Sequence, residues 1–447
     1  MHINYNFLSI HLKALNLYRF KRKWLFFTTN ELEILQLNRL KKLLLQFHEN
    51  PFYGGILQKA GLTFQEIHNI DNIHEILSRL PILTKDDIHK HKEEMLNKNA
   101  RGIFEDSSGG STGTPLNFYH DETWLINMAS TTLINDTMQG WYFFCPHVKL
   151  WGSPKDAGEL DSVSGKILNI IRRRHFCDSF DMPVEKLWKY HADMEKFRPV
   201  VIFSYASSIY ILANFLHAHG IDPSYPTRSI ISTAECLDEQ MRDKIQKVFK
   251  VPVYDRYGSR EVGCIGGECE KHKGMHLHIY DHILECIDPR SGKPVRGGAG
   301  ELIITDLNNY AFPFIRYRIG DWGILSTEKC NCGRNGPMLK KVLGRTTDTI
   351  TTKSGRMVHG EYFTHVFYGV DGVSQFQFVQ ENREHYRLFI VKNENYQDDF
   401  TKSIVREINE VIGEDCCLEV HFVDEIPVTN SGKHRFTISK VPINIKS

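Results

Sequence analysis

Hydrophobic positions along the chain follow one pattern in its first part and another in the middle. Up to about residue 100 they recur at helical spacing, as in 31–47, where leucines return every three or four positions. Beyond that point, short apolar runs alternate with amphipathic stretches. The runs predict strands at 148–151, 200–205, 229–232 and 251–254, and the stretches between them predict helices at 184–197, 206–219 and 238–249. Strands alternating with helices predict an α/β domain with a largely parallel sheet.

The pattern changes again after residue 344. Strands are expected at 375–379, 386–391 and 418–423, with a helix at 399–412. This order predicts a small α+β module. We therefore expect a helical N-terminal part of the large domain (1–100), an α/β core (101–344) and a small C-terminal α+β domain (345–447).

Composition narrows the class of protein. Hydrophobic residues make up 41% of the 447 positions, charged residues 24%, and the net charge is +1, so neither a nucleic acid nor another polyanion is an expected partner. No apolar stretch approaches the roughly 20 residues of a membrane span, and no secretion signal is evident, so we expect a cytoplasmic protein. In that compartment the ten cysteines are expected to be thiols or metal ligands.

The segment 18–27 places basic residues beside aromatic ones. It predicts a helix that docks on the rest of the protein. A helix lying on a membrane surface is the alternative.

A loop rich in glycine and hydroxyl residues occupies 107–115. Its amides and hydroxyls can surround phosphate oxygens, and it lacks the Lys-Ser/Thr pair of a Walker loop. A plain surface loop is the alternative interpretation. The central residues are Ser108, Gly109, Gly110, Ser111, Thr112 and Gly113.

Two carboxylates follow strand-like runs. Glu261 closes the run 254–261, directly after an apolar strand, where a carboxylate can hold Mg²⁺ that bridges phosphates; a charged turn is the alternative. Asp321 follows the aromatic-basic run 314–319 and suits a ribose diol, because an ionised carboxylate accepts both hydroxyl protons. Further along lie Arg345, in the run 344–348, and Lys433, after a Ser-Gly turn.

Taken in order, these motifs resemble those of the adenylate-forming superfamily of acyl- and aryl-CoA synthetases. The closer resemblance is to phenylacetate–CoA ligases and their CapK-like relatives, and it spans residues 80–433. It implies a large layered N-terminal domain of the adenylate-forming type and a small mobile C-terminal domain that carries a catalytic lysine. It also implies ATP and Mg²⁺, with CoA as a possible further substrate.

The resemblance assigns roles to individual positions. The loop 108–113 would close over the β- and γ-phosphates of ATP, Glu261 would help to hold magnesium, and Asp321 would bind the ribose hydroxyls. Arg345 would support ribose or phosphate, and Lys433 would neutralise charge as the carboxylate attacks the α-phosphorus. The adenine-packing segment would contain Thr233, Ala234 and Glu235, and the junction of the nucleotide and acyl pockets would contain Tyr257 and Gly258.

Two further stretches bear on the family comparison. Trp151 with Gly152, and the run 205–208, fall where the family builds the wall of its acyl pocket. Thr347 precedes Asp348 where family members carry two adjacent aspartates, at the hinge of the small domain. The hinge is therefore where this chain departs from the family pattern, and the departure bears on the CoA-dependent second step.

A Cys-x-x-His and a Cys-x-Cys set predict a structural Zn²⁺ site, because four nitrogen and sulfur ligands suit its tetrahedral coordination. We expect the ligands to be Cys269, His272, Cys330 and Cys332. His276 and His278 are the alternatives. His272 is favoured because the segment 274–276 matches a family segment that also occurs without the cysteines.

The sequence is compatible with three functions. The first is ATP-dependent activation of a carboxylic acid to acyl-AMP with transfer to CoA. The second shares the first step but passes the acyl group to an amine or hydroxyl, as in capsular polysaccharide or natural-product synthesis. The third is a nucleotide-binding scaffold without catalysis, against which the presence of Glu261, Asp321, Arg345 and Lys433 argues.

Overall fold

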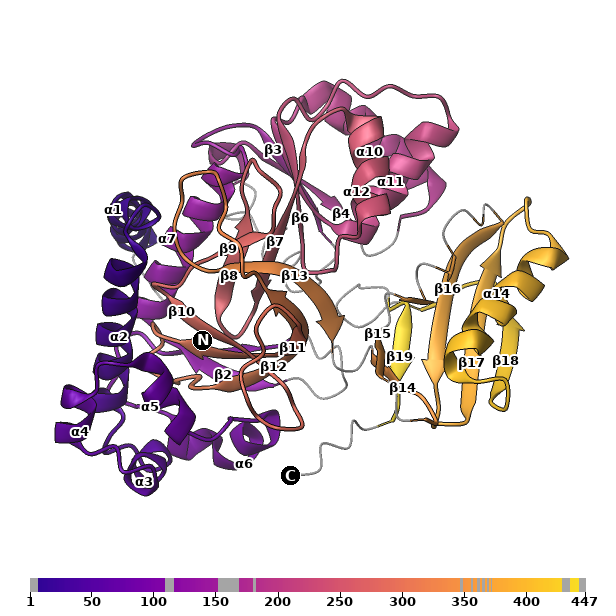
Figure 1. Ribbon diagram of the computed structural model, residues 1–447. Helices are drawn as coiled ribbons and strands as arrows, with labels where there is room; N and C mark the ends of the chain where they lie inside the picture. Colours follow the sequence, from indigo (N-terminus) through magenta and orange to yellow (C-terminus); the bar gives the residue numbers. More distant parts are fainter. Residues whose placement is uncertain are drawn as a thin grey trace.

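The structure, a computed structural model, shows a large domain and a smaller C-terminal domain beside it (Figure 1). It describes residues 7–108, 116–151, 169–179, 182–345, 349–354, 357–359, 362–363, 366–367, 370, 372–427 and 435–441. Among them, no helix combines the length and apolar character needed to cross a bilayer.

The N-terminal part is helical, and its helices begin where capping residues stand. Thr84, for example, accepts a hydrogen bond from the amide of Asp87, whose carboxylate in turn accepts from the amide of Thr84. The helices of this part are α1 (Phe7–Trp24), α2 (Thr29–Gln46), α3 (Tyr53–Lys59), α4 (Phe64–Asn69), α5 (Ile73–Arg79) and α6 (Lys85–Met95).

The middle of the chain folds around one sheet of 11 strands, ordered β10-β11-β12-β13-β9-β8-β7-β6-β5-β3-β4. The strands from β7 to β4 in this order run parallel, and those from β10 to β7 run antiparallel. The expected α/β architecture is thereby confirmed. The parallel half contains β3 (His147–Trp151), β4 (Arg174–Asp178), β5 (Val201–Tyr205), β6 (Ser229–Thr233) and β7 (Val253–Ser259), with helices α7 (Glu122–Met138), α10 (Val184–Phe197), α11 (Ala206–Ala218) and α12 (Glu239–Phe249).

The antiparallel half continues directly from β7. It contains β8 (Gly263–Glu268), β9 (Met275–Leu277), β10 (His282–Ile287), β11 (Ala299–Asp306), β12 (Tyr317–Leu325) and β13 (Met338–Arg345). A separate hairpin of β1 (Phe104–Ser107) and β2 (Asn117–His120) precedes α7.

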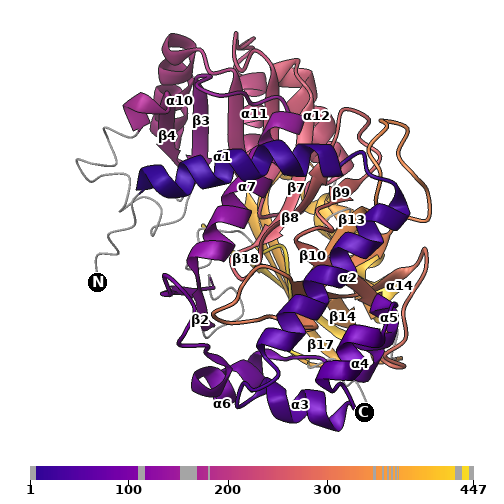
Figure 2. The same cartoon turned by 90° about the vertical axis from the view of Figure 1, so that its left-hand side faces the viewer.

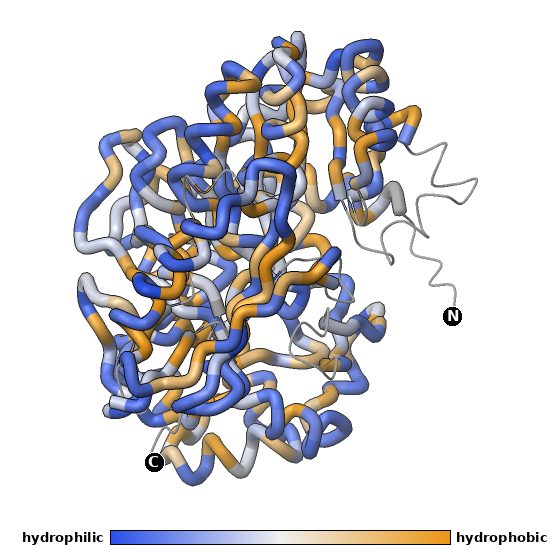
Figure 3. The backbone as a smooth tube through the Cα atoms, turned by 90° about the vertical axis from the view of Figure 1, so that its right-hand side faces the viewer, coloured by the Kyte–Doolittle hydropathy of each residue, from blue (hydrophilic) through white to orange (hydrophobic). Residues whose placement is uncertain are grey.

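The small domain is built on a mixed four-stranded sheet, ordered β18-β17-β16-β19. Its helix α14 (Asp398–Ile412) buries Ile404 and Ile408, which belong to one apolar cluster with Phe378 and Leu388 of the sheet. Figure 3, which views the molecule from the side of this domain, shows hydrophobic and hydrophilic stretches alternating along the backbone. The strands of this domain are β14 (Thr349–Thr351), β15 (Met357–His359), β16 (Val373–Gln380), β17 (His385–Lys392), β18 (Cys417–Phe422) and β19 (Thr437–Ser439).

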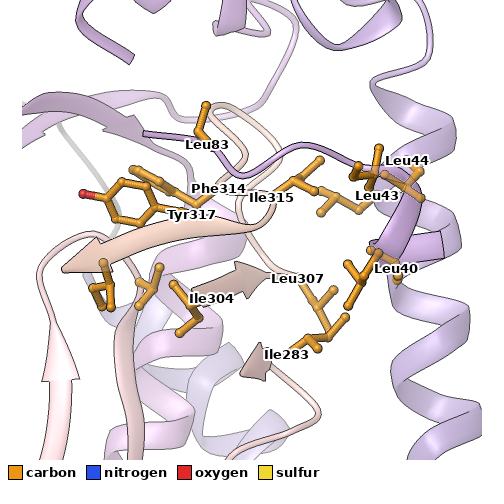
Figure 4. Packing of buried hydrophobic residues seen from close by; sticks show 14 of the residues in the cluster. Leu40, Leu43, Leu44, Leu83, Ile283, Ile304, Leu307, Phe314, Ile315 and Tyr317 are labelled. Atoms are coloured by element: carbon orange, nitrogen blue, oxygen red, sulfur yellow. The ribbon is translucent and has the colours of Figure 1, made fainter. Parts of the chain in front are cut away.

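Helix α2 attaches the N-terminal part to the antiparallel strands through an apolar cluster. Leu40, Leu43 and Leu44 are fully buried; Leu40 points toward Leu307 and Ile283, and Leu43 and Leu44 lie beside Ile315 (Figure 4). Because each buried leucine stabilises the fold by about 2 kcal/mol relative to an exposed one, this contact holds the N-terminal helices firmly on the sheet.

A buried ion pair fixes α1, which crosses the large domain in Figure 2. The Nζ atom of Lys21 lies 2.7 Å from both carboxylate oxygens of Asp281 and 2.9 Å from Oγ1 of Thr131. Burial lowers the pKa of Lys21 to about 8, against the opposing effect of Asp281. Burial alone would raise the pKa of Asp281, but Lys21 and Arg39 lower it to about 2. Each partner therefore compensates a charge that would otherwise be buried alone.

We expect Lys21→Ala to destabilise the protein by about 3–5 kcal/mol, because it leaves the Asp281 carboxylate buried without its cation. Urea unfolding followed by tryptophan fluorescence measures the change. Lys23→Ala is the control, since Lys23 lies on the same helix but is exposed. Equal unfolding midpoints for the two variants would contradict this role of the ion pair.

Candidate active site

The strand order of the parallel half changes direction at β3, and in open α/β sheets such a switch point marks a crevice at the carboxyl edge of the strands. The chain passes from β3 to β4 on one side and then returns to β5 on the other side of β3. Ligands of open α/β sheets bind at such a switch point. Trp151 ends β3 and Tyr205 ends β5, and their ring centroids lie 4.6 Å apart. An aromatic pair therefore stands at the switch point.

The turn after β6 is tied to the helix after β5. Thr233 ends the strand, and Ala234 adopts a positive φ of 69°. A carboxylate oxygen of Glu235 then accepts a hydrogen bond of 2.8 Å from the amide of Ser207, in the first turn of α11. This contact is favourable because the N-terminus of a helix presents unsatisfied amides and a positive dipole end, and the preceding Tyr205 makes no side-chain cap. The segment 233–235 is thus held at the crevice.

Arg256 on β7 braces the same turn. Its Nε atom lies 3.5 Å from Oγ1 of Thr233, and its Nη1 atom lies 2.9 Å from a carboxylate oxygen of Asp136 on α7. Its guanidinium also lies 5.9 Å from the ring centroid of Phe203. Neither Arg256 nor Asp136 was among the expected site residues. Arg256 falls inside the run 254–261, whereas nothing in the sequence around Asp136 indicates a partner so distant along the chain.

A hydrogen bond joins the two halves of the large sheet. The hydroxyl of Tyr257 on β7 donates to Oδ2 of Asp321 on β12 at 2.8 Å. β8, β9 and β13 separate these strands in the sheet order, so the sheet bends sharply to bring them together. Asp321 also pairs in backbone register with Arg345, the last residue of β13. The structure thus brings three of the expected site residues to one place.

Glu261 lies in the turn that follows β7 and is buried, with 7% of its surface exposed. Its carbonyl lies 3.0 Å from Nε2 of His120, which must donate because a carbonyl only accepts. The His120 ring stacks on Trp124 at 3.4 Å, and burial lowers the pKa of His120 to about 4. A neutral histidine that sequence reasoning missed therefore anchors the turn. Gly258 is needed because a Cβ atom there would lie 2.6 Å from the carbonyl oxygen of Gly263.

Ser108 closes the base of the glycine-rich loop. Its amide donates to the carbonyl of Leu116 at 2.9 Å, and its hydroxyl accepts from the amide of Leu116 at 2.9 Å. The remaining expected loop residues lie outside the described residues, as do Lys433, Thr347, Asp348 and the side chain of Arg345. The loop residues concerned are Gly109, Gly110, Ser111, Thr112 and Gly113.

A second cluster lies at the joint of β9 and β13. The ligand atoms of Cys269, His276, Cys330 and Cys332 all lie within 4.8 Å of one another. The sulfur atoms of Cys269 and Cys330 are 3.7 Å apart, and that of Cys332 lies 3.3 Å from Nε2 of His276. Three cysteines and one histidine form a donor set that suits tetrahedral Zn²⁺.

The choice of His272 as the fourth ligand does not agree with this geometry. Nδ1 of His272 lies 3.3 Å from the carboxylate of Glu268 instead, while Nδ1 of His278 contacts the hydroxyl of Tyr280 at 2.9 Å. His276 reaches the cysteines because it pairs with Met338, at the start of the strand that follows Cys330 and Cys332. His272 was favoured because the segment 274–276 matches a family segment that also occurs without the cysteines, and the sequence alone does not show which strands pair.

Comparison with known proteins agrees with the fold. The family model of the CapK C-terminal domain matches residues 350–440. CapK of Staphylococcus aureus is 27% identical over 92% of this chain and 90% of its own length. A phenylacetate–coenzyme A ligase of Aromatoleum evansii is 24% identical over 72% of each chain. The crystal structure of 2-hydroxyisobutyryl-CoA ligase in its postadenylation state superimposes with a TM-score of 0.74 at 17% identity, over 93% of this chain and 91% of that one.

The sheet order, its switch point and these similarities define an adenylate-forming fold of the AMP-forming ligase type. Among proteins of this type, the chain is similar to CapK and to the phenylacetate–CoA ligases.

Proposed function

We propose that the protein uses ATP to convert a carboxylic acid to its acyl-AMP and pyrophosphate, and then transfers the acyl group to CoA. The observation that supports the proposal is the hydrogen bond between Tyr257 and Asp321, which brings the carboxylate assigned to ribose close to β7. The segment 233–235, assigned to adenine, lies at the end of β6, and Glu261, assigned to magnesium, follows β7. The residues assigned to adenine, ribose and magnesium therefore lie near the ends of two neighbouring strands.

The chemistry explains why these groups must gather. A carboxylate oxygen attacks the α-phosphorus of ATP and pyrophosphate leaves, so two anions must approach each other in line. The amides of the loop 108–113 and the ammonium of Lys433 would stabilise the negative charge that develops. Glu261 would hold Mg²⁺, which would supply positive charge against the phosphates. Tyr257 would orient the Asp321 carboxylate toward the ribose.

The aromatic pair at the switch point supports the position of the acyl pocket. Trp151 and Tyr205 meet at 4.6 Å, where the family builds its pocket wall. Aromatic side chains favour contact with an apolar acyl group because they bury a large surface. An apolar carboxylic acid therefore fits this position.

An acyl acceptor other than CoA is the second candidate. Similarity to CapK extends over 92% of the chain and that to phenylacetate–CoA ligase over 72%, and the CapK model matches the small domain. Thr347 also departs from the aspartate pair at the family hinge. An amine or hydroxyl group would attack the same acyl-AMP and release AMP.

We expect Lys433→Ala to lower acid-dependent ATP–pyrophosphate exchange by about 100-fold, because it removes a cation that acts mainly in the transition state. ATP affinity, measured by calorimetry, should change little. Asp321→Asn is the matched variant and should instead weaken ATP binding about tenfold, because it weakens a charged contact to the ribose. Normal exchange by the Lys433 variant would overturn its assignment.

A second experiment decides the acceptor. A panel of acids is incubated with ATP and either CoA or hydroxylamine, which traps acyl-AMP as a hydroxamate. We expect an acid that yields hydroxamate also to yield a CoA thioester with one AMP released per thioester. If every active acid yields hydroxamate but no thioester, the acceptor is an amine or hydroxyl and the protein is not a CoA ligase.

We also propose that the cluster at β9 and β13 binds one structural Zn²⁺ through Cys269, His276, Cys330 and Cys332. Such a closed site would fasten two strands of the sheet to each other. His276→Asn should therefore lose the metal and lower the melting temperature. His272→Asn should keep the metal, since that ring contacts Glu268. Elemental analysis of the purified proteins measures this, and metal loss in neither variant or in both would contradict the ligand set.

A further inference from the structure

The amino edge of the parallel strands, opposite the candidate site, carries an exposed aromatic tip. Tyr142, Phe143 and Phe144 precede β3 and are 47%, 40% and 67% exposed. Phe144 has a φ of 63°, in the left-handed region that is unfavourable for a bulky side chain. A residue with a strained backbone and a solvent-exposed ring contributes little to the stability of the fold. Strain and exposure at one position therefore point to binding.

Arginines surround this tip. Arg173 directly precedes β4 and Arg228 directly precedes β6. The carbonyl of Arg173 accepts a hydrogen bond of 3.0 Å from the amide of His147, at the start of β3. The guanidinium of Arg228 lies 5.7 Å from the ring centroid of Tyr142. Both arginines are exposed, and both belong to loops that meet at the same edge of the sheet.

Helix α1 extends the same surface. Its Tyr18 ring meets Phe143 edge-on at 6.0 Å, and the guanidinium of Arg22 lies 5.6 Å from the Tyr18 ring centroid. Further along, Nη2 of Arg172 lies 2.9 Å from Nε2 of His11 on α1. Figure 2 shows α1 crossing the molecule below the β3–β4 end of the large sheet. The inner face of α1 is buried, so only its outer flank is available to a partner.

We propose that this basic-aromatic face docks on an anionic lipid surface. The face comprises Arg22, Tyr142, Phe143, Phe144, Arg173 and Arg228. Among the described residues, no acidic side chain forms an ion pair with any of its three arginines. Their positive charge is therefore available to lipid phosphates. Aromatic rings favour the boundary between headgroups and acyl chains, so charge and exposed rings select the same partner.

A lipid surface explains both features better than a dissolved polyanion does. A polyanion would use the arginines and would gain little from Phe144, whose ring points to solvent from a strained backbone. Docking by the amino edge would also leave the carboxyl edge facing the solution. The inference does not depend on which acyl acceptor the protein uses.

The test is flotation of the full-length protein with vesicles. One set is pure phosphatidylcholine, and the other contains phosphatidylglycerol as well. We expect the protein to float with the anionic vesicles at low salt, to be released as salt rises, and not to bind the neutral set. Recovery on both sets alike, or on neither, overturns the proposal.

Two variants assign the binding to this face. Phe144→Asn removes the ring and keeps a residue that tolerates the left-handed conformation, so the fold should be retained while vesicle binding falls. Arg22→Gln with Arg228→Gln should weaken binding about 25-fold, from about fivefold for each arginine. Acid-dependent ATP–pyrophosphate exchange should be unchanged in both variants, which would show that both fold correctly.

Phe422→Asn and Arg290→Gln are the matched controls, since these residues are exposed on β18 and on the turn between β10 and β11. They should bind vesicles as the unaltered protein does. Equal losses in the controls would overturn the assignment to this face. The protein could fail to bind vesicles while sedimentation shows that Phe144→Asn converts an oligomer to a monomer. In that case the face contacts another protein molecule and the lipid proposal is wrong.

Discussion

The parallel register of β3, β5, β6 and β7 is the constraint on which the remaining structure depends. Hydrogen bonds between these strands place all their carboxyl ends at one edge. Residues from far apart in the sequence therefore reach one crevice without any local motif bringing them there. The bend of the antiparallel half then adds Asp321 from a strand that lies four places away in the sheet order.

Much of the fold could be predicted from periodicity. Helix α10 has the expected limits, and β3, β5 and β6 lie within one residue of theirs, because these elements are strongly apolar on one face or buried on both. β4, β8 and β9 were missed. β4 carries polar residues in a short run, and β8 is rich in glycine, so neither shows a clear alternation.

The site was harder to predict where it depends on strand pairing. Asp321 and Glu261 stand in sequence runs that indicate their chemistry, and the structure places both near β7. His276 and His120 carry no such sign. Each acquires its neighbours only when distant strands pair or when β2 packs on the turn after β7, so pairing information decided between His276 and His272.

The strand β13 has a mechanical consequence for the small domain. It starts beside the cysteine-histidine cluster, where Met338 pairs with His276, and ends beside the candidate site, where Arg345 pairs with Asp321. The chain leaves the large sheet only after that last pair. Any movement of the small domain relative to the sheet would therefore turn about a point beyond Arg345, so it need not disturb the hydrogen bond between Tyr257 and Asp321.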